Sequence, residues 1–356
     1  MQPGQGAADI DEAALQEGNE LGSGGEGRVY RVHGQPEPTA FKKYKDPRRV
    51  DPSALKTLAD LPGQLQPSER DRLHQQTAWP RARVYDKGKL SGFLMREIPG
   101  RFMAPNSAGA VKNRALQYLL YPRMPLWGDI VPAGGVSTQT RIDVAREFTG
   151  LVTLLHSRTL VIGDVSLLNL LWTGTDGQPV TIFLIDCDGI RSLGQAPVSR
   201  QLDTPGWRDD QQPPTGPDLD TDRYKLALVV GRTLSCQAEL YPGKHPLALP
   251  PDVPDRMADR IQTLWKQAAG PYGQRPDAKQ WLNAFANRDE IVLAPLGPAR
   301  KRYPTSVGMA DPDPPANTLR QGIPVTPPTQ RPRPQAAPPP PRPSIPLRLP
   351  APPPKP

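Results

Sequence analysis

Two short apolar runs with a polar loop between them constrain this chain more than any other feature. Residues 161–172 read VIGDVSLLNLLW, and residues 182–188 read IFLIDCD. Apolar runs of this length predict short buried strands, and the intervening residues 174–179 predict a hairpin turn. Asp164, Asn169 and Asp186 stand at the strand ends. An amide and two carboxylates provide a proton acceptor and the few oxygen ligands that Mg²⁺ takes when phosphates supply the others.

A glycine-rich segment near the N-terminus is the candidate phosphate-binding element. Gly22, Gly24 and Gly27 fit G-x-G-x-x-G, and Val29 follows two positions later. A dinucleotide-binding fold would continue from such glycines into a helix, but residues 28–32 (RVYRV) alternate and are rich in strand formers. A hairpin that turns at glycines is the phosphate-covering loop of protein kinases. A glycine-rich surface hairpin without a ligand is the alternative interpretation.

The next predicted strands carry a lysine and the edge of a base pocket. Residues 39–44 (TAFKKY) resemble the kinase V-A-I-K strand, and period two places Ala40 and Lys42 on one face. Lys42 fits the phosphate-binding lysine better than Lys43, although an exposed basic strand end is also possible. In a kinase-like arrangement, a hairpin over residues 83–98 would lead to a hinge, where Met95 would border the adenine pocket and the backbone of residues 96–98, which include Glu97, would pair the base. An ordinary β-meander is the alternative for this hairpin.

Five helices are predicted from apolar periodicity and capping residues. They cover residues 51–61, 140–157, 221–234, 255–269 and 277–287, and Asp51 and Asp220 are the expected caps of the first and third. The third is apolar almost all round, which is typical of a buried helix. His156, at the end of the second helix, is interpreted as structural. Pro122, Pro125 and Pro132 interrupt any long helix in residues 101–138, which receive no assignment.

Both ends of the chain are predicted to be disordered, over residues 1–14 and 297–356. Residues 300–356 carry nine Lys or Arg against two Asp, so the other 299 residues have a net charge of only +1 out of +8. A basic groove for nucleic acid is therefore not indicated in the folded part. Residues 343–348 fit P-x-x-P-x-R, which suggests a partner that binds proline motifs, although most such tails only space or solubilise. Two cysteines without metal spacing, no leader and no membrane span indicate a soluble cytoplasmic protein.

Taken in order, these signals resemble the protein kinase superfamily over roughly residues 18–288, and more narrowly bacterial kinase-like proteins with a G-D-x₄-N loop. The resemblance implies an α+β, two-lobed kinase-like fold. Its β-rich N-lobe would cover residues 15–98, its mainly helical C-lobe residues 99–290, and the proline-rich tail residues 297–356.

The resemblance also implies an activity, namely transfer of phosphate from ATP to Ser or Thr hydroxyls of protein substrates with Mg²⁺ or Mn²⁺. Asp164 would accept the hydroxyl proton, Asn169 and Asp186 would bind the metal, and Lys42 would pair with the phosphates. Asp222 would brace the catalytic loop by accepting backbone hydrogen bonds. The nucleotide-binding set would be Gly22, Gly24, Gly27, Val29, Ala40, Lys42, Met95 and Glu97.

Several positions depart from the kinase pattern. H-R-D reads Ile162-Gly163-Asp164, the lysine two residues later is Ser166, and D-F-G reads Asp186-Cys187-Asp188. No glutamate stands in the first helix to hold Lys42, and Arg275 has no obvious glutamate partner because A-P-E reads DDQ at 209–211. Loss of one charge-assisted contact in a dry site costs ~2–4 kcal/mol of transition-state stabilisation, so slow turnover is expected. A nucleotide-binding pseudokinase scaffold and a small-molecule phosphotransferase of the antibiotic type are the alternatives.

Overall fold

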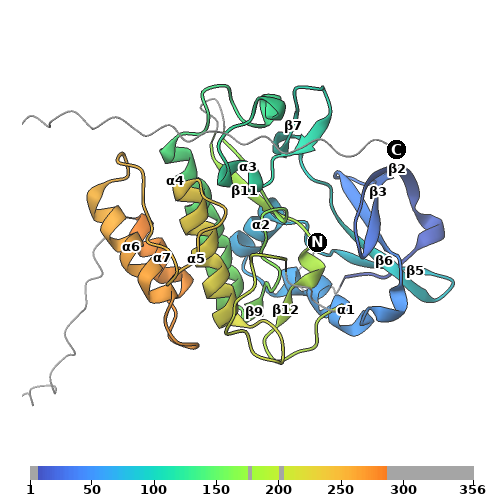
Figure 1. Ribbon diagram of the computed structural model, residues 1–356. Helices are drawn as coiled ribbons and strands as arrows, with labels where there is room; N and C mark the ends of the chain where they lie inside the picture. The colour runs from blue at the N-terminus through green and yellow to red at the C-terminus, as the bar shows by residue number, and fades with distance from the viewer. Residues whose placement is uncertain (1–6, 175–178, 200–203, 287–356) are drawn as a thin grey trace, which may run out of the picture. The chain divides into compact units, whose positions relative to one another are not determined.

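The computed structural model describes residues 7–174, 179–199 and 204–286, all within one compact unit, Met1–Val292. A second unit, Leu293–Pro356, lies outside the described residues, and so do the predicted proline-rich tail and its P-x-x-P-x-R segment. Within the described unit the fold is mixed α/β, rich in sheet toward the N-terminus and helical toward the C-terminus (Figure 1). Across the three described ranges, no helix is long and apolar enough to cross a membrane.

A six-stranded sheet forms the N-terminal part, in the order β1-β5-β6-β4-β3-β2. Neighbours are antiparallel except for the parallel pair β1 and β5. Both predicted hairpins are confirmed, because β2 pairs with β3 across the glycine turn and β5 pairs with β6. The strands are β1 (Ile10–Asp11), β2 (Gln16–Ser23), β3 (Gly27–His33), β4 (Thr39–Tyr44), β5 (Ala82–Asp86) and β6 (Lys89–Arg96).

The N-terminal segment differs from the predicted disorder over residues 1–14. Ile10 and Asp11 pair with Val84 and Tyr85 of β5, and a 3-10 turn, η1 (Glu12–Ala14), follows. The Glu12 carboxylate pairs with Lys43 on β4 and accepts a hydrogen bond from Ser91 on β6. These long-range contacts order a segment whose composition alone resembles a loose terminus; residues 1–6 lie outside the described residues.

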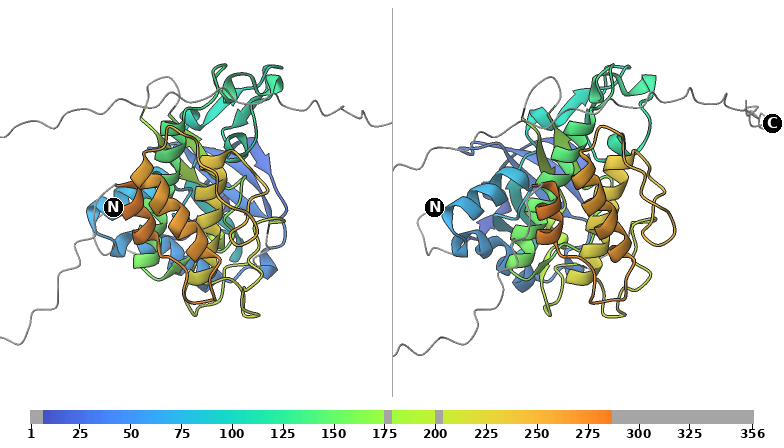
Figure 2. Two further views of the ribbon diagram at one scale, coloured as in Figure 1. Left: turned by 60° about the vertical axis from the view of Figure 1, so that its left-hand side comes forward. Right: turned by 90° about the vertical axis from the view of Figure 1, so that its left-hand side faces the viewer.

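Helices make up most of the C-terminal part, and all five predicted helices are present with ends shifted by a few residues. α4 packs against α5 and α7, and α5 packs against α6 (Figures 1 and 2). The cap of α5 is Asp218, which accepts the N–H groups of Asp220 and Thr221, so the prediction of Asp220 as cap is wrong. The helices are α1 (Pro52–Asp60), α2 (Pro67–Gln76), α3 (Gln117–Leu120), α4 (Thr138–Ser157), α5 (Leu219–Ser235), α6 (Asp255–Ala268) and α7 (Ala278–Phe285).

Three two-stranded sheets complete the structure, and two of them flank the polar loop. β9 (Leu160–Val161) pairs with β12 (Arg191–Ser192), and β10 (Leu170–Thr173) pairs with β11 (Thr181–Leu184), which confirms the predicted strand pair. The third sheet joins β7 (Met103–Pro105) and β8 (Val111–Asn113) in the region that the sequence left unassigned. Loop 162–169 is therefore held by a strand at each end.

Candidate functional site

Helix α5 fixes the loop between β9 and β10 from below. Asp222 is buried and accepts the N–H groups of Ile162 at 2.6 Å and Gly163 at 2.9 Å, as predicted for a bracing carboxylate. Gly163 has φ 76°, which favours glycine, and its carbonyl accepts a bond of 2.6 Å from Lys225 Nζ. His156 Nε2 lies 3.3 Å from Asp222, which agrees with its structural interpretation. The backbone leading into Asp164 is thus held by two charged side chains of α5, Asp222 and Lys225.

The Asp164 carboxylate is oriented by hydrogen bonds to both of its oxygens. Asn169 Nδ2 donates to Oδ2 and to the Asp164 carbonyl, each at 3.1 Å, and Thr204 Oγ1 donates to Oδ1 at 2.9 Å. Burial raises the pKa of Asp164, and the opposing effects of Thr204, Lys225 and Asn169 only partly offset it. A fixed, half-buried carboxylate with a raised pKa is suited to accept a proton near neutral pH.

Asp186 lies beside this loop, immediately after β11. The Ile185 N–H donates to the Asn169 carbonyl at 2.9 Å, so the backbone of one segment is bonded to the other. Asp186 adopts a left-handed conformation (φ 55°) and its side chain is 55% exposed. Because Asn169 Nδ2 is engaged with Asp164, the Asn169 amide oxygen is the atom left for a ligand. Together with the Asp186 carboxylate it makes a hard oxygen donor pair of the kind that fits Mg²⁺.

Lys42 reaches the same place from the sheet. Its ammonium lies 2.8 and 2.9 Å from the two oxygens of Asp188, 3.3 Å from Asp186 and 3.5 Å from Glu26. Burial alone lowers the pKa of Lys42, but Asp188 and Asp186 more than offset this and raise it, so the lysine is charged. Lys43 pairs with Glu12 instead, which distinguishes the two adjacent lysines.

The glycine turn and its neighbours lie on strands next to Lys42. Gly22 pairs in register with Val29, Val29 with Lys42, and Ala40 with Met95. A Cβ at Gly27 would lie 2.6 Å from the Lys43 carbonyl, so close strand packing requires glycine there. At Gly22, Gly24 and Gly25, by contrast, an added Cβ would meet nothing within 4 Å. Contacts within the described chain therefore do not explain why these three positions are small.

Glu97 is engaged within the protein. Its carboxylate pairs with Arg31 at 2.6 and 3.0 Å, and its N–H donates to the Pro38 carbonyl at 3.0 Å. The Glu97 carboxylate and N–H thus already have partners in the protein. The prediction that a base pairs with the backbone of residues 96–98 stays a prediction, and it concerns the carbonyl groups and the remaining N–H groups.

Arg275 has a partner that the sequence did not reveal. Both of its terminal nitrogens donate to the Asp209 carboxylate, and Asp220 lies 3.2 Å away. Asp209 and Arg275 are both buried. The sequence predicted only that Arg275 has no obvious glutamate partner, and its partner is indeed an aspartate, at the first position of D-D-Q.

Sequence reasoning also missed three residues at the site. The sequence indicates Asp188 only as the loss of a flexible glycine, and it assigns no site role to Glu26 or Tyr44. Tyr44 donates to Asp188 at 3.1 Å, and Glu26 accepts from Ser199 at 3.0 Å. Strand period could have placed Tyr44, which is two residues from Lys42 on the same face of β4. Nothing local in the sequence indicates the contacts of Asp188 or Glu26.

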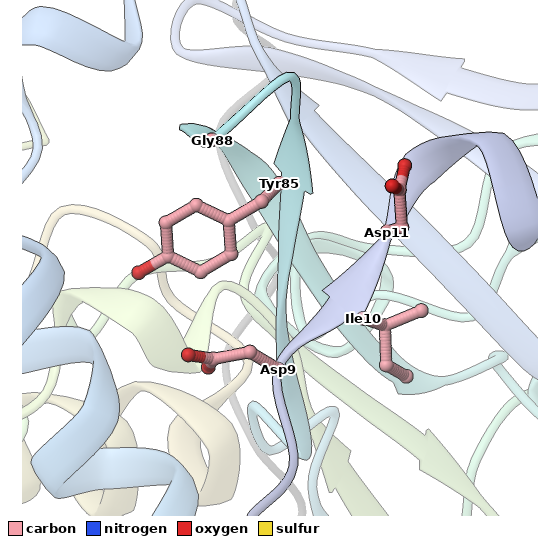
Figure 3. A pocket seen from close by; sticks show the side chains of 5 residues that line it. All are labelled: Asp9, Ile10, Asp11, Tyr85 and Gly88. Atoms are coloured by element: carbon pink, nitrogen blue, oxygen red, sulfur yellow. The ribbon is translucent and has the colours of Figure 1, made fainter.

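A separate pocket lies at the β1–β5 edge of the sheet, lined by Asp9, Ile10, Asp11, Tyr85 and Gly88 (Figure 3). Both oxygens of Asp9 accept hydrogen bonds from Arg83, which also stacks on Tyr85. This pocket shares no residue with the site around Lys42 and Asp164. In the part of the chain that the structure describes, no group of three or more His, Cys, Asp or Glu could hold a metal ion.

No protein-family model matches the sequence, and a search among curated proteins returned no significant match. Function is therefore inferred from the residues and their contacts alone.

Proposed function

We propose that this chain is a protein serine/threonine kinase of the two-lobed kinase type, which transfers phosphate from ATP to hydroxyl groups with Mg²⁺ or Mn²⁺. One observation carries the proposal. Lys42, Asp164, Asn169 and Asp186 come from three separate segments and are joined in a single contact network. A cation, a proton acceptor and two oxygen ligands in one place are the parts that phosphoryl transfer requires.

The roles follow from the position of each group. Asp164 accepts the proton of the acceptor hydroxyl while that oxygen forms a bond to the γ-phosphorus and the bond from phosphorus to the β,γ-bridging oxygen breaks, which releases ADP. Lys42 supplies a fixed positive charge for the α- and β-phosphates. Asn169 and Asp186 would hold the metal ion, which when bound neutralises phosphate charge. Catalysis depends mainly on positioning, and Asp222 and Lys225 provide it by holding the loop that carries Asp164.

The glycine turn supports the nucleotide part of the proposal. Gly22, Gly24 and Gly25 are small although no protein atom would meet a Cβ there, so the space beside the turn is open to a ligand. Backbone N–H groups of a glycine turn suit phosphate oxygens, and here the Gly24 N–H donates to the Gly27 carbonyl, so the other N–H groups of the turn would have to do so.

One observation favours a second candidate, a nucleotide-binding scaffold without transfer. Ser166 stands where kinases carry a lysine beside the transferring phosphate, and it is 2% exposed and uncharged. If no other group supplies that charge, nucleotide binding survives while turnover is lost.

Labelled ATP distinguishes the two candidates. We expect the wild-type chain to incorporate phosphate into itself or into a generic protein acceptor in the presence of Mg²⁺. Asp164→Ala should lower the rate by at least about a hundredfold without loss of nucleotide binding, and Asp186→Ala should abolish the Mg²⁺-dependent transfer. The exposed Asp71→Ala on α2 is the matched control. Nucleotide binding without any incorporation supports the scaffold, and incorporation unchanged by Asp164→Ala contradicts the role of Asp164.

The predicted proline-motif partner of residues 297–356 is a separate proposal. A chain that ends before residue 297 should keep catalysis and lose capture by domains that bind polyproline. Loss of the fold on truncation would contradict the interpretation of this segment as a tail.

A further inference from the structure

Two acids of the N-terminal helices α1 and α2 are engaged away from Lys42. Asp60, at the end of α1, binds Lys56 and the Ala7 N–H. Glu69, on α2, caps its own helix and pairs with Arg158. Both carboxylates are thus engaged with partners other than Lys42.

Asp188 is instead the close partner of Lys42. It is 1% exposed, and its two oxygens lie 2.8 and 2.9 Å from the ammonium. Tyr44 donates to the same carboxylate at 3.1 Å, so two side chains on one face of β4 hold Asp188. The Lys42 side chain is only 6% exposed, and each buried charge therefore depends on the other for compensation.

We propose that Asp188 is the residue that positions Lys42 for nucleotide phosphates, in place of a carboxylate on helix α1. The inference rests on the proposed function only for the identity of the ligand. Asp188 is a positioning residue, since it acts through Lys42.

This arrangement couples the lysine to the metal-binding segment. Asp186 and Asp188 are joined through the 3-10 turn η6 (Cys187–Gly189), and the Gly189 N–H donates to the Asp186 carbonyl at 3.2 Å. The lysine and the candidate metal ligand are therefore oriented by one short segment. Displacement of α1 should leave the pair intact, so a switch that acts by moving this helix is not expected here.

A double-mutant cycle tests the pair without any nucleotide. The full-length chain, Lys42→Met, Asp188→Asn and the double variant are unfolded with denaturant. Each single change leaves one buried charged group without its closest partner, so we expect each to lower the folding equilibrium constant by roughly a hundredfold. The double variant should be no less stable than the less stable of the two single variants. Losses that simply add would overturn the pairing.

Asp188→Gly tests positioning, because it restores the common D-x-G triplet. If Asp188 holds Lys42, this variant should raise the KM for ATP or the Kd for an ATP analogue about tenfold or more, and Asp188→Asn should behave alike. The matched control is Asp60→Asn, which removes the acid of α1 and should leave both constants within about twofold. A purely structural role for Asp188 would lower the melting temperature but leave the KM of the folded fraction unchanged.

The two measurements separate the inference from the proposed function. A wild-type chain that neither binds ATP nor transfers phosphate defeats the proposed function, and the cycle then still decides whether Asp188 positions Lys42. An active wild type with additive losses, or with Asp188→Gly at wild-type KM, overturns the inference alone.

Discussion

Thr204 Oγ1 donates a hydrogen bond of 2.9 Å to Oδ1 of Asp164, although 40 residues separate them in the chain. Asn169 donates to the other oxygen of the same carboxylate. The candidate proton acceptor is therefore held between its own loop and the distant segment that carries Thr204, so the orientation of Asp164 depends on where residue 204 lies.

We expect Thr204→Val to lower kcat about tenfold with little change in the KM for ATP. Valine has a similar shape but cannot donate, and loss of one hydrogen bond to a charged group costs ~1.5 kcal/mol or more. Thr204→Ser keeps the hydroxyl and should retain most of the activity. Steady-state transfer rates at saturating ATP provide the measurement, and equal rates for the valine and serine variants would contradict the orienting role.

Glu26 is expected to compete with nucleotide phosphates for Lys42. Its carboxylate lies 3.5 Å from the lysine and is 47% exposed, so it can leave but adds a negative charge where phosphates bind. Glu26→Gln should therefore tighten binding of an ATP analogue about two- to fivefold, the scale of one exposed charge pair. Isothermal titration measures this, with the exposed Glu20→Gln on β2 as the control. Weaker binding by Glu26→Gln would show that Glu26 assists the ligand.

Asp222→Asn should destabilise the fold by ~2–3 kcal/mol. An amide can accept only one of the two backbone bonds from Ile162 and Gly163, and its NH₂ group would face the other N–H in a buried site. Chemical denaturation gives the value directly. His156→Gln, which disturbs the more distant partner of the same carboxylate, should cost ~1 kcal/mol or less.

Local patterns in the sequence were sufficient for α1, α4, α5, α6 and α7, for the hairpins and for the loop with Asp164, because spacing and strand period specify them, whereas α2 and α3 were not predicted. The sequence indicated that Asp222, an acid in the first turn of a buried helix, needs a partner, and the resemblance to kinases implied that the loop provides it. Partners that come together only through tertiary packing were not predictable. Asp209 and Arg275 are 66 residues apart, and Asp188 and Lys42 are 146 residues apart.

The N-terminal segment was missed for the same reason. Its short run of small and acidic residues gives no periodic signal, and its order depends on β5 and on Lys43. Composition reports the average tendency of a segment, whereas a short parallel strand pairing and a few polar contacts decide its structure.

The pair of Asp209 and Arg275 predicts a large effect on stability. Both side chains are nearly inaccessible, so Arg275→Met should leave the Asp209 charge unpaired and cost ~3–5 kcal/mol. A double variant, Asp209→Leu with Arg275→Met, removes both charges and should recover part of that loss. Denaturation midpoints of the wild type, Arg275→Met and the double variant test this. A double variant that is less stable than Arg275→Met would show that the pair stabilises the fold by more than the compensation of one buried charge by the other.

Glu12 predicts a pH-dependent contribution of the N-terminal segment. Burial raises the pKa of Glu12, but the hydrogen bonds from Lys43 and Ser91 together lower it by more than burial raises it. The pKa of Glu12 is therefore below the ordinary 4.5. A carboxylate with a lowered pKa in the folded state stabilises the protein above its unfolded pKa, and this contribution is lost as the pH falls through the folded value. Glu12→Gln should therefore cost ~0.5–1 kcal/mol at pH 7. The difference from wild type should shrink at pH values below 4.5, the ordinary pKa of the group.

Urea denaturation at several pH values measures this change in the effect of Glu12→Gln, with the exposed Glu17→Gln as the control. A difference that stays constant across the acid range would mean that shape, and not the charge of Glu12, holds the segment on the sheet.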